Sequence, residues 1–582
     1  MILFGLLLNM QRTIILFLFI LFASSIFVIS SHFANPPAPA LYIAAGGCCV
    51  LAFLAIVQRY KQQTFSLSVT EVLLGGFFLF SIVYGEYNGS LNLEWIIMGV
   101  SLFLFYMFLK RTQVTIAWLF AGLVFIGIAQ AIYGLGQYVH WFRNMAASGF
   151  RMSGSFDNPA GFAATLSVCF PFALFLLHKK EIYWKIPGSL AIVLFIVAVV
   201  LSQSRAGIIT IIAISGIWTV KALNLKWLNS WGIRTKILCS ATLIILILSG
   251  LYFMKKDSAN GRLLIWQCSA HMIADKPLFG HGIGGFQREY MLYQANFFRN
   301  HPESSFSMLA DIVKHPFNEF LLLLVEQGLV GGLLLGLFIY MLIREYRKNK
   351  KQETFYTMLC LIGIGVFACF SYPLGYPFVR LMAVFCAAFI MQAETRRWKI
   401  PKGLFSIIKP TVLVVSVALL VLTCNMFYNE YRWNVIAQRS LAGETKAVMP
   451  DYARLYKTMN RNGLFLYNYA AELNFIDENK TSNHYFEEAS HYMNDIDIQL
   501  QMADNYQKMK QYKKAEKCLL EAHYMIPNRF IPLYRLAKLY EETNQREHVK
   551  SMATIILNKP IKIMSPEILT IQMEMKELIN KI

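Results

Sequence analysis

The fold class is decided by residues 93–137, which read LEWIIMGVSLFLFYMFLKRTQVTIAWLFAGLVFIGIAQAIYGLGQ. Two apolar runs, 93–109 and 114–137, are separated by a short polar segment that begins with Lys110 and Arg111. A membrane-spanning helix needs about 20 mostly apolar residues. The stretch therefore predicts two membrane spans joined by a short basic loop.

Apolar runs of this kind continue along the chain to about residue 430. Of the 582 residues, 56% are hydrophobic and 15% are charged, whereas a soluble domain carries roughly 25% charged residues. We therefore expect an all-α polytopic membrane protein with about thirteen transmembrane helices. The predicted spans lie at roughly 13–30, 39–57, 68–84, 93–109, 114–137, 159–177, 186–203, 206–220, 237–253, 318–343, 355–371, 377–392 and 404–427.

Basic residues gather in every second loop between these spans, whereas intervening loops such as 31–38 and 85–92 carry none. Because Lys and Arg are enriched in cytoplasmic loops, this alternation predicts a cytoplasmic N-terminus and an outer location for the long loop at about 254–316. These loops account for the net charge of +20, so we expect no nucleic-acid partner. The basic loops contain Arg12; Arg59 and Lys61; Lys110 and Arg111; Lys179, Lys180 and Lys185; Lys221, Lys226, Arg234 and Lys236; Arg344, Arg347, Lys348, Lys350 and Lys351; and Arg396, Arg397, Lys399 and Lys402.

The side of the C-terminal part depends on residues 371–377, which lie between two short apolar runs. A hairpin there gives an odd number of spans and an outer C-terminal part, whereas one broken helix would make that part cytoplasmic. The basic loops on both sides of the pair favour the hairpin.

The chain turns polar after the last apolar run, which predicts a membrane domain at 1–429 and a soluble helical domain at 430–582. In the soluble part Ala503 recurs as Ala537, 34 residues later, and Tyr506 follows the same spacing. This is the period of a tetratricopeptide repeat. Repeats of this type bind peptide or protein segments, which predicts a protein partner. A module that packs on the membrane domain is the alternative.

The ten cysteines include no CxxC pair, so the sequence predicts neither a zinc site nor a disulfide framework. The first apolar runs lack a small-residue cleavage site, and we expect them to be an anchor and not a removed signal peptide.

Three of the arginines on the predicted outer side are candidates for function, because the positive-inside rule gives no reason for them there. Arg205 lies in SQSRAG, Arg262 lies in GRLLIW, and Arg151 precedes the turn-rich SGSFDNP. Charged residues in or beside membrane spans are costly and usually functional. The alternatives are a snorkelling side chain and solvated loop arginines.

The glycine-rich segment GHGIGGF occupies residues 280–286. Its Gly282 and Gly284 would allow backbone amides to approach a phosphate. A tight turn explains the same pattern.

The segment KHPFNE, residues 314–319, precedes a predicted span. On a helix, Glu319 is offset from His315 by about 40° and Glu326 by about 20°. If the helix already includes His315, one face carries a histidine and two carboxylates beside Asn318. A histidine next to a carboxylate is a candidate general base, and a histidine held by its neighbours is the alternative.

In their order along the chain, these segments resemble the O-antigen ligase and polymerase superfamily. The resemblance covers about residues 150–335. The motifs are S-x-S-R-x-G at 202–207, R-x-x-x-W at 262–266, P-L-x-G-x-G-x-x-x-F at 277–286, H-x-x-N-E at 315–319 and E-x-G-x-x-G at 326–331.

The resemblance implies a type-C glycosyltransferase-like fold in the bacterial inner membrane, with the active site and the C-terminal domain in the periplasm. It also implies a glycan donor on undecaprenyl diphosphate and no metal or other cofactor. The implied site residues are Arg205, Arg262 and Arg151 at the donor diphosphate, His315 and Glu319 at the acceptor hydroxyl, and Asn318, Glu326, Gly282 and Gly284 in support.

One departure concerns the base. Many members place a histidine directly before the asparagine, where this chain has Phe317. The base is therefore His315 in a shifted register, or a carboxylate such as Glu319. A tetratricopeptide tail of this kind resembles that of Bacteroidetes members.

Three transferase activities fit this resemblance. An O-antigen ligase, which we expect, uses lipid A–core as the acceptor. A polymerase extends another lipid-linked glycan, and a protein O-oligosaccharyltransferase glycosylates a polypeptide that the repeats would present. A transporter fits the spans alone, but it predicts paired half-membrane repeats, which we do not find in the sequence.

Overall fold

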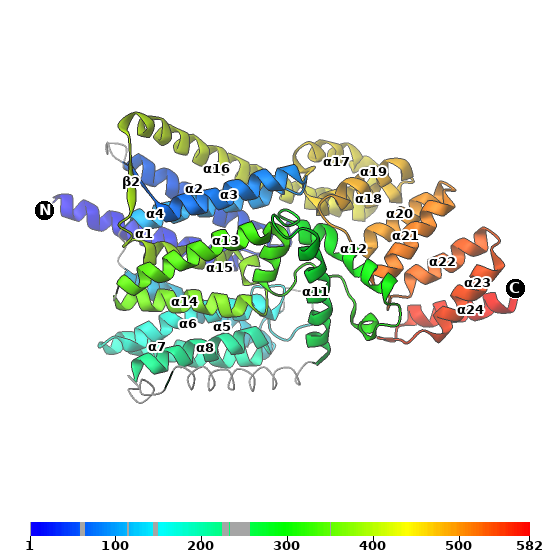
Figure 1. The fold of residues 1–582 in the computed structure, drawn as a ribbon, viewed down its shortest axis with the longest axis horizontal. Coiled ribbons are helices and arrows are strands. Elements are labelled where there is room, and N and C mark those ends of the chain that lie inside the picture. Colours follow the sequence, from blue (N-terminus) through cyan, green and yellow to red (C-terminus); the bar gives the residue numbers. More distant parts are fainter. Residues whose placement is uncertain are drawn as a thin grey trace.

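The computed structural model describes residues 2–58, 65–112, 116–143, 149–223, 232, 256–349 and 351–581. The chain is almost entirely helical and elongated, with a bundle of long helices at one end and a stack of short helices at the other (Figure 1). The bundle helices are α1 (Ile2–Phe27), α2 (Ala38–Gln58), α3 (Val69–Tyr87), α4 (Leu93–Arg111), α5 (Ile116–Tyr138), α6 (Pro159–His178), α7 (Ile182–Leu201), α8 (Arg205–Ala222), α13 (Glu319–Lys348), α14 (Gln352–Ala368), α15 (Pro377–Met391) and α16 (Lys402–Arg439).

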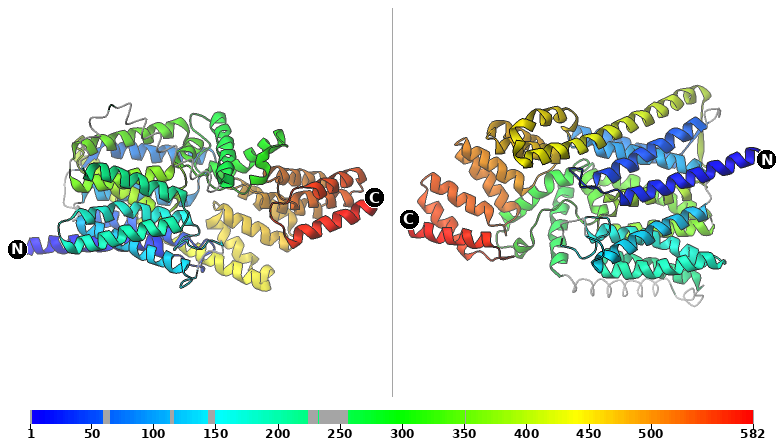
Figure 2. Two further views of the ribbon diagram at one scale, coloured as in Figure 1. Left: turned by 90° about the horizontal axis from the view of Figure 1, so that it is seen from below. Right: turned by 180° about the vertical axis from the view of Figure 1, so that it is seen from behind.

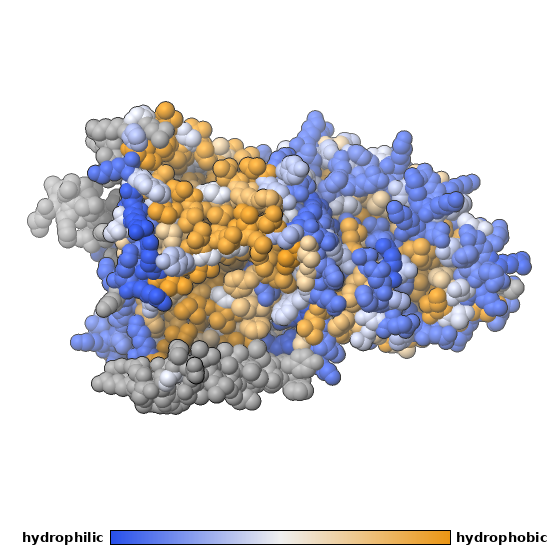
Figure 3. All heavy atoms as spheres, in the orientation of Figure 1, coloured by the Kyte–Doolittle hydropathy of each residue, from blue (hydrophilic) through white to orange (hydrophobic). Residues whose placement is uncertain are grey.

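The bundle is that of a multi-pass membrane protein. Among the described residues, nine helices are long and apolar enough to cross a membrane, and three shorter apolar helices accompany them. These helices match all the predicted spans except the one at 237–253, which lies outside the described residues. Apolar side chains cover the visible face of the bundle, between a hydrophilic edge and the hydrophilic C-terminal part (Figure 3).

A two-stranded ribbon marks one end of the bundle. The strand β1 (Phe65–Ser68) pairs antiparallel with β2 (Arg397–Ile400). The two strands lie in the connections before α3 and after α15, so two of the predicted basic loops meet here. We call this the β end of the bundle.

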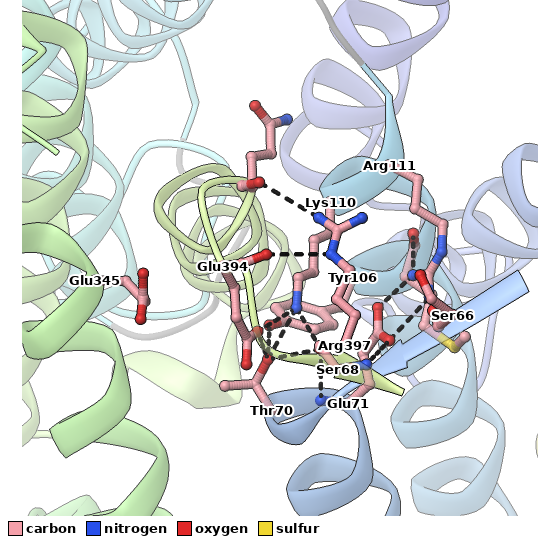
Figure 4. A network of polar contacts seen from close by, with 12 residues as sticks. Ser66, Ser68, Thr70, Glu71, Tyr106, Lys110, Arg111, Glu345, Glu394 and Arg397 are labelled. Carbon is pink, nitrogen blue, oxygen red and sulfur yellow. Dashed lines mark hydrogen bonds and ion pairs between the residues drawn. The ribbon is translucent and has the colours of Figure 1, made fainter. Parts of the chain in front are cut away.

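Charged side chains pair inside the β end (Figure 4). Lys110 Nζ lies 2.6 Å from Glu394 Oε2, and Arg111 bonds to Glu71. Lys110 also donates hydrogen bonds to the Ser68 and Thr70 hydroxyls. Because these residues come from α3, α4 and the segment after α15, the network ties three parts of the chain together.

The opposite end carries the long loop that the sequence predicts at 254–316. Its elements are α11 (Lys256–Asp275), α12 (Gly285–Asn300) and the 3₁₀-helix η1 (Ser305–Leu309). Figure 1 shows α11 running across the ends of the bundle helices. We call this the loop end.

The C-terminal part lies at the loop end (Figure 2). The Gln294 side chain on α12 donates a 2.7 Å hydrogen bond to the Met525 carbonyl, and Phe286 and Ala522 share a hydrophobic cluster. The predicted hairpin at 371–377 is confirmed, because α14 and α15 are separate helices packed against each other. The predicted placement of the long loop and the C-terminal part on one side therefore holds.

Short helices that each pack against the next make up the C-terminal part. The predicted boundary at 429/430 falls inside α16, and the tetratricopeptide assignment stays a prediction. The elements are the π-helical turn η3 (Ser440–Glu444), α17 (Thr445–Met459), α18 (Gly463–Phe475), α19 (Asn479–Ser490), α20 (Ile496–Lys508), α21 (Tyr512–Met525), α22 (Ile531–Glu542), α23 (Arg546–Asn558) and α24 (Pro566–Lys581).

Candidate active site

The turn between α14 and α15 contributes one side of the candidate site at the loop end. This turn contains the 3₁₀-helix η2 (Pro373–Gly375). The ring of Tyr372 stacks on the ring of His315, with centroids 4.5 Å apart and planes 20° apart. The Tyr372 hydroxyl accepts a 3.0 Å hydrogen bond from Asn158 Nδ2, and Asn158 caps α6. The turn therefore connects the histidine to the start of α6.

His315 lies before α13 and not on it. Asn318 caps the helix by accepting hydrogen bonds from two backbone amides of the first turn, and α13 begins at Glu319. Phe317 has φ +54°, a left-handed conformation that is uncommon for bulky residues. The expected helical face that combines His315 with Glu319 and Glu326 therefore does not form, and the aromatic stack orients the histidine instead.

Two side chains of α11 contact the segment around His315. Trp266 Nε1 donates a 2.9 Å hydrogen bond to the Pro316 carbonyl. The guanidinium carbon of Arg262 lies 5.1 Å from the centre of the Phe317 ring, within the range of a cation–π contact. Residues four apart share one helix face, which explains the R-x-x-x-W spacing: both side chains hold the segment that carries the histidine.

Arg205 and Arg262 form a pair of neighbouring cations. Arg205 is the first residue of α8, and its Nη2 donates a 2.8 Å hydrogen bond to Ser258 Oγ. Burial, and then the nearby charge of Arg205, lower the pKa of Arg262 to about 10. Among the described residues, no carboxylate forms an ion pair with Arg262. Two cations held close together form a suitable site for an anion.

The surroundings of His315 favour the neutral form of its imidazole. Burial, followed by the charges of Arg380 and Lys314, lowers its pKa to about 4. Within the described part of the chain, neither ring nitrogen makes a hydrogen bond. A neutral imidazole with a nitrogen available can accept a proton from a substrate hydroxyl.

Glu319 is held against the turn that carries Tyr372. Its Oε1 accepts a 2.9 Å hydrogen bond from the Leu374 amide. The Leu374 carbonyl in turn accepts a hydrogen bond from Arg380 Nε. The carboxylate therefore contacts the backbone two residues after Tyr372, whose ring stacks on His315.

The glycine-rich segment packs against a break in α13. The amides of Gly282 and Gly284 donate 2.9 Å hydrogen bonds to the carbonyl and the side chain of Glu326. Gly328 has φ +59° and interrupts the helix there. A Cβ on Gly280 would lie 2.5 Å from the Glu326 carbonyl carbon, so the two backbones cross too closely for a side chain. This geometry favours the tight turn over the phosphate cradle, because both amides already have partners.

Residues 190–336 match the family model described as O-antigen ligase. This segment of the chain is therefore similar to the O-antigen ligase family. No curated protein matches the chain. That family consists of glycosyltransferase-like membrane enzymes.

The O-antigen ligase segment contains most of the residues described above. Arg205, Arg262, His315 and Glu319 all lie within it. Arg151 lies outside it, exposed in the loop before α6. In the described part of the chain, no hydrogen bond or ion pair joins Arg151 to another residue, so its donor-binding role stays a prediction.

Two residues of this candidate site were missed by the sequence reasoning. Arg380 was visible as a charge inside a predicted span, a signal that favours function. Tyr372 was part of the turn-forming segment, but nothing in the sequence pairs it with His315, 57 residues earlier (372 − 315). Among the described residues, no group of three or more His, Cys, Asp or Glu side chains is arranged to hold a metal. Metal independence stays a prediction.

Proposed function

We propose that this protein transfers a glycan from undecaprenyl diphosphate to an acceptor hydroxyl at the periplasmic face of the bacterial inner membrane. The proposed activity is that of an O-antigen ligase with lipid A–core as the acceptor. The observation that carries the proposal is the grouping of Arg205, Arg262 and His315 at the loop end, inside the segment that matches the family.

The proposed reaction is a single displacement. The acceptor oxygen forms a bond to the anomeric carbon while the bond from that carbon to the diphosphate oxygen breaks. The acceptor proton passes to His315, and undecaprenyl diphosphate leaves with the bonding electrons. Its departure builds negative charge, which Arg205 and Arg262 stabilise through bidentate phosphate contacts that exist before the reaction begins.

The basic residues of the β end support the proposed orientation. Lys110, Arg111 and Arg397 lie there, and basic residues mark the cytoplasmic side. The loop end, with the site and the C-terminal part, then faces the periplasm. This is where a lipid-linked glycan and its acceptor would meet.

A polypeptide acceptor is the second candidate, and it would make the protein an O-oligosaccharyltransferase. The supporting observation is the contact between the C-terminal helices and the long loop. A cavity of about 440 Å³ lies between the long loop and the C-terminal helices, and its lining includes Pro302, Ser307, His523 and Lys559. In this variant of the proposal the C-terminal part, as a tetratricopeptide-like module, presents the polypeptide near the transfer site.

A deletion strain of the source bacterium distinguishes the acceptors. Ligase activity predicts loss of the lipopolysaccharide ladder, accumulation of the lipid-linked glycan and intact periplasmic glycoproteins. Loss of the glycoproteins with an intact ladder would favour the polypeptide acceptor. If both products persist and no lipid-linked glycan accumulates, the proposed function is wrong. Complementation with the wild-type gene restores the lost product, and with Arg262→Ala it does not.

A further inference from the structure

Arg380 occupies an unfavourable position for a cation. It lies in the first turn of α15, an apolar helix of the bundle. The N-terminal end of a helix carries partial positive charge, and an ionised side chain inside a membrane span is costly and usually functional. An arginine kept at such a position needs local compensation.

The compensation comes from two other helices. Glu319 on α13 and Glu94 on α4 both lie within Coulombic range of the Arg380 guanidinium. Two carboxylates around one cation keep its charge stable inside the bundle. Glu94 is itself held by a 2.9 Å hydrogen bond from the Tyr42 hydroxyl, so this counter-charge is fixed in place.

Arg380 and Glu319 hold the same residue of the turn from opposite sides. Arg380 Nε donates to the Leu374 carbonyl, and the Leu374 amide donates to Glu319 Oε1 at 2.9 Å. At the other edge of the turn, Asn158 Nδ2 donates to the Tyr372 hydroxyl. These contacts fix the turn at both edges.

The ring that stacks on His315 belongs to this turn. Tyr372 is two residues from Leu374, and its ring contacts His315 at a centroid distance of 4.5 Å and Phe317 at 5.6 Å. Neither ring nitrogen of His315 makes a hydrogen bond within the described residues. The orientation of the imidazole therefore depends on the stack, and the stack depends on the turn.

We propose that Arg380 is a positioning residue of the transfer reaction: by fixing the turn at Leu374 together with Glu319, it holds Tyr372 and thereby orients His315 for proton uptake. This inference rests on the proposed function. Arg380 acts through its neighbours, because its Nε is engaged with the turn and two carboxylates offset its charge.

The pH profile separates this role from a purely structural one. Burial, and then the charge of Arg380, lower the pKa of His315, so removing that charge moves the pKa upward. The titratable and charged groups around the histidine are Lys314 in its own segment, Glu319 at the start of α13, Tyr372 in the turn, Arg262 on α11 and Arg380 on α15.

The test uses the full-length protein in detergent or lipid, with a purified lipid-linked glycan donor and its acceptor. We expect Arg380→Gln to lower kcat by about 10- to 100-fold, because small misplacements of a reacting group cost this much. The donor KM should stay within about twofold of wild type, and the acidic limb of the kcat/KM profile should move to higher pH. The matched control is Arg344→Gln at the β end, where Arg344 pairs with Glu345, and it should behave as wild type.

Arg380→Lys keeps the charge but loses the planar fork. We expect it to keep the acidic limb near its wild-type position while kcat stays low, and this variant serves as the test if Arg380→Gln does not fold. A donor KM raised more than tenfold with unchanged kcat would make Arg380 a donor ligand and overturn the inference. Wild-type kcat and pH profile in both variants would also overturn it. Absence of transfer by the wild-type protein would instead overturn the proposed function.

Discussion

The β end and the loop end of the bundle both contain buried basic side chains, and Lys110 at the β end differs from Arg262 at the loop end in the partner that it has. At the β end, Lys110 and Glu394 are almost fully buried and lie 2.6 Å apart, and Arg111 bonds to Glu71. At the loop end, Arg262 has no carboxylate partner among the described residues. The charge of a second cation, Arg205, lies close enough to lower the pKa of Arg262.

This difference distinguishes charged side chains that stabilise the fold from charged side chains that are available to a ligand. In a buried ion pair each charge compensates the other, and removing one partner leaves an uncompensated charge. Two adjacent arginines disfavour each other's charge, and an incoming anion relieves this repulsion. Groups whose pKa is shifted by burial and by like charge gather at functional sites. We therefore assign stability to the β end and chemistry to the loop end.

The largest effect on turnover is expected at His315. His315→Ala should lower the transfer rate by about 10²–10⁴-fold, the usual contribution of a general base. Donor binding should persist, because the diphosphate contacts of Arg205 and Arg262 remain. Single-turnover transfer from the purified donor measures the rate directly.

Glu319→Gln is the matched comparison for His315→Ala. The glutamine oxygen can still accept the hydrogen bond from Leu374, so we expect a smaller loss than for the histidine variant. Wild-type turnover in His315→Ala together with an inactive Glu319→Gln would identify the carboxylate as the base and contradict our assignment.

Breaking the ion pair at the β end should affect stability but not chemistry. Lys110→Met leaves Glu394 buried without its cation, which typically costs about 3–5 kcal/mol. The thermal unfolding midpoint in detergent should fall, and Lys110→Met/Glu394→Met should recover part of the loss. The transfer rate per folded molecule should stay within about twofold of wild type. A selective loss of turnover with an unchanged midpoint would break the division between the two ends.

The smallest change is expected in the pH dependence. Burial, Arg380 and Lys314 lower the pKa of His315 to about 4, and the neutral imidazole is the reactive form. The value of kcat/KM should therefore be nearly constant between about pH 6 and pH 8 and decline only as the pH falls toward 4 to 5. An unperturbed histidine would instead lose half of this activity near pH 6.5. Initial rates at low donor concentration measure the profile, and a midpoint near 6.5 would argue against a desolvated base.

Hydropathy was sufficient to predict most of the bundle, since each predicted span within the described residues corresponds to an apolar helix. The alternation of basic loops predicted that the long loop and the C-terminal part share one side, because the same physical rule governs every loop. Arg262 and Trp266 lie four residues apart and share one helix face, but the sequence did not indicate what that face contacts. Only the fold brings residues 316 and 317 to that face.

Contacts between distant segments were not predictable in this way. Helical geometry alone placed His315 on one face with Glu319, whereas the cap at Asn318 and the left-handed Phe317 end the helix before the histidine. The glycine-rich segment was compatible with a phosphate site or a tight turn, and the sequence could not show that Gly280 lies too close to the α13 backbone for a side chain. Such crossings depend on two segments at once, and neither segment specifies its partner.

The central claim is that the two neighbouring arginines of the loop end hold the donor diphosphate, and equilibrium binding of undecaprenyl diphosphate to the purified protein tests it most directly. We predict that Arg262→Ala and Arg205→Ala each weaken binding by at least about tenfold, because each removes charge-assisted phosphate contacts. Lysine replacements should restore little of the affinity, because lysine lacks the planar fork. Arg344→Gln at the β end and His315→Ala should bind as the wild type does. Wild-type affinity in both arginine-to-alanine variants would contradict the account.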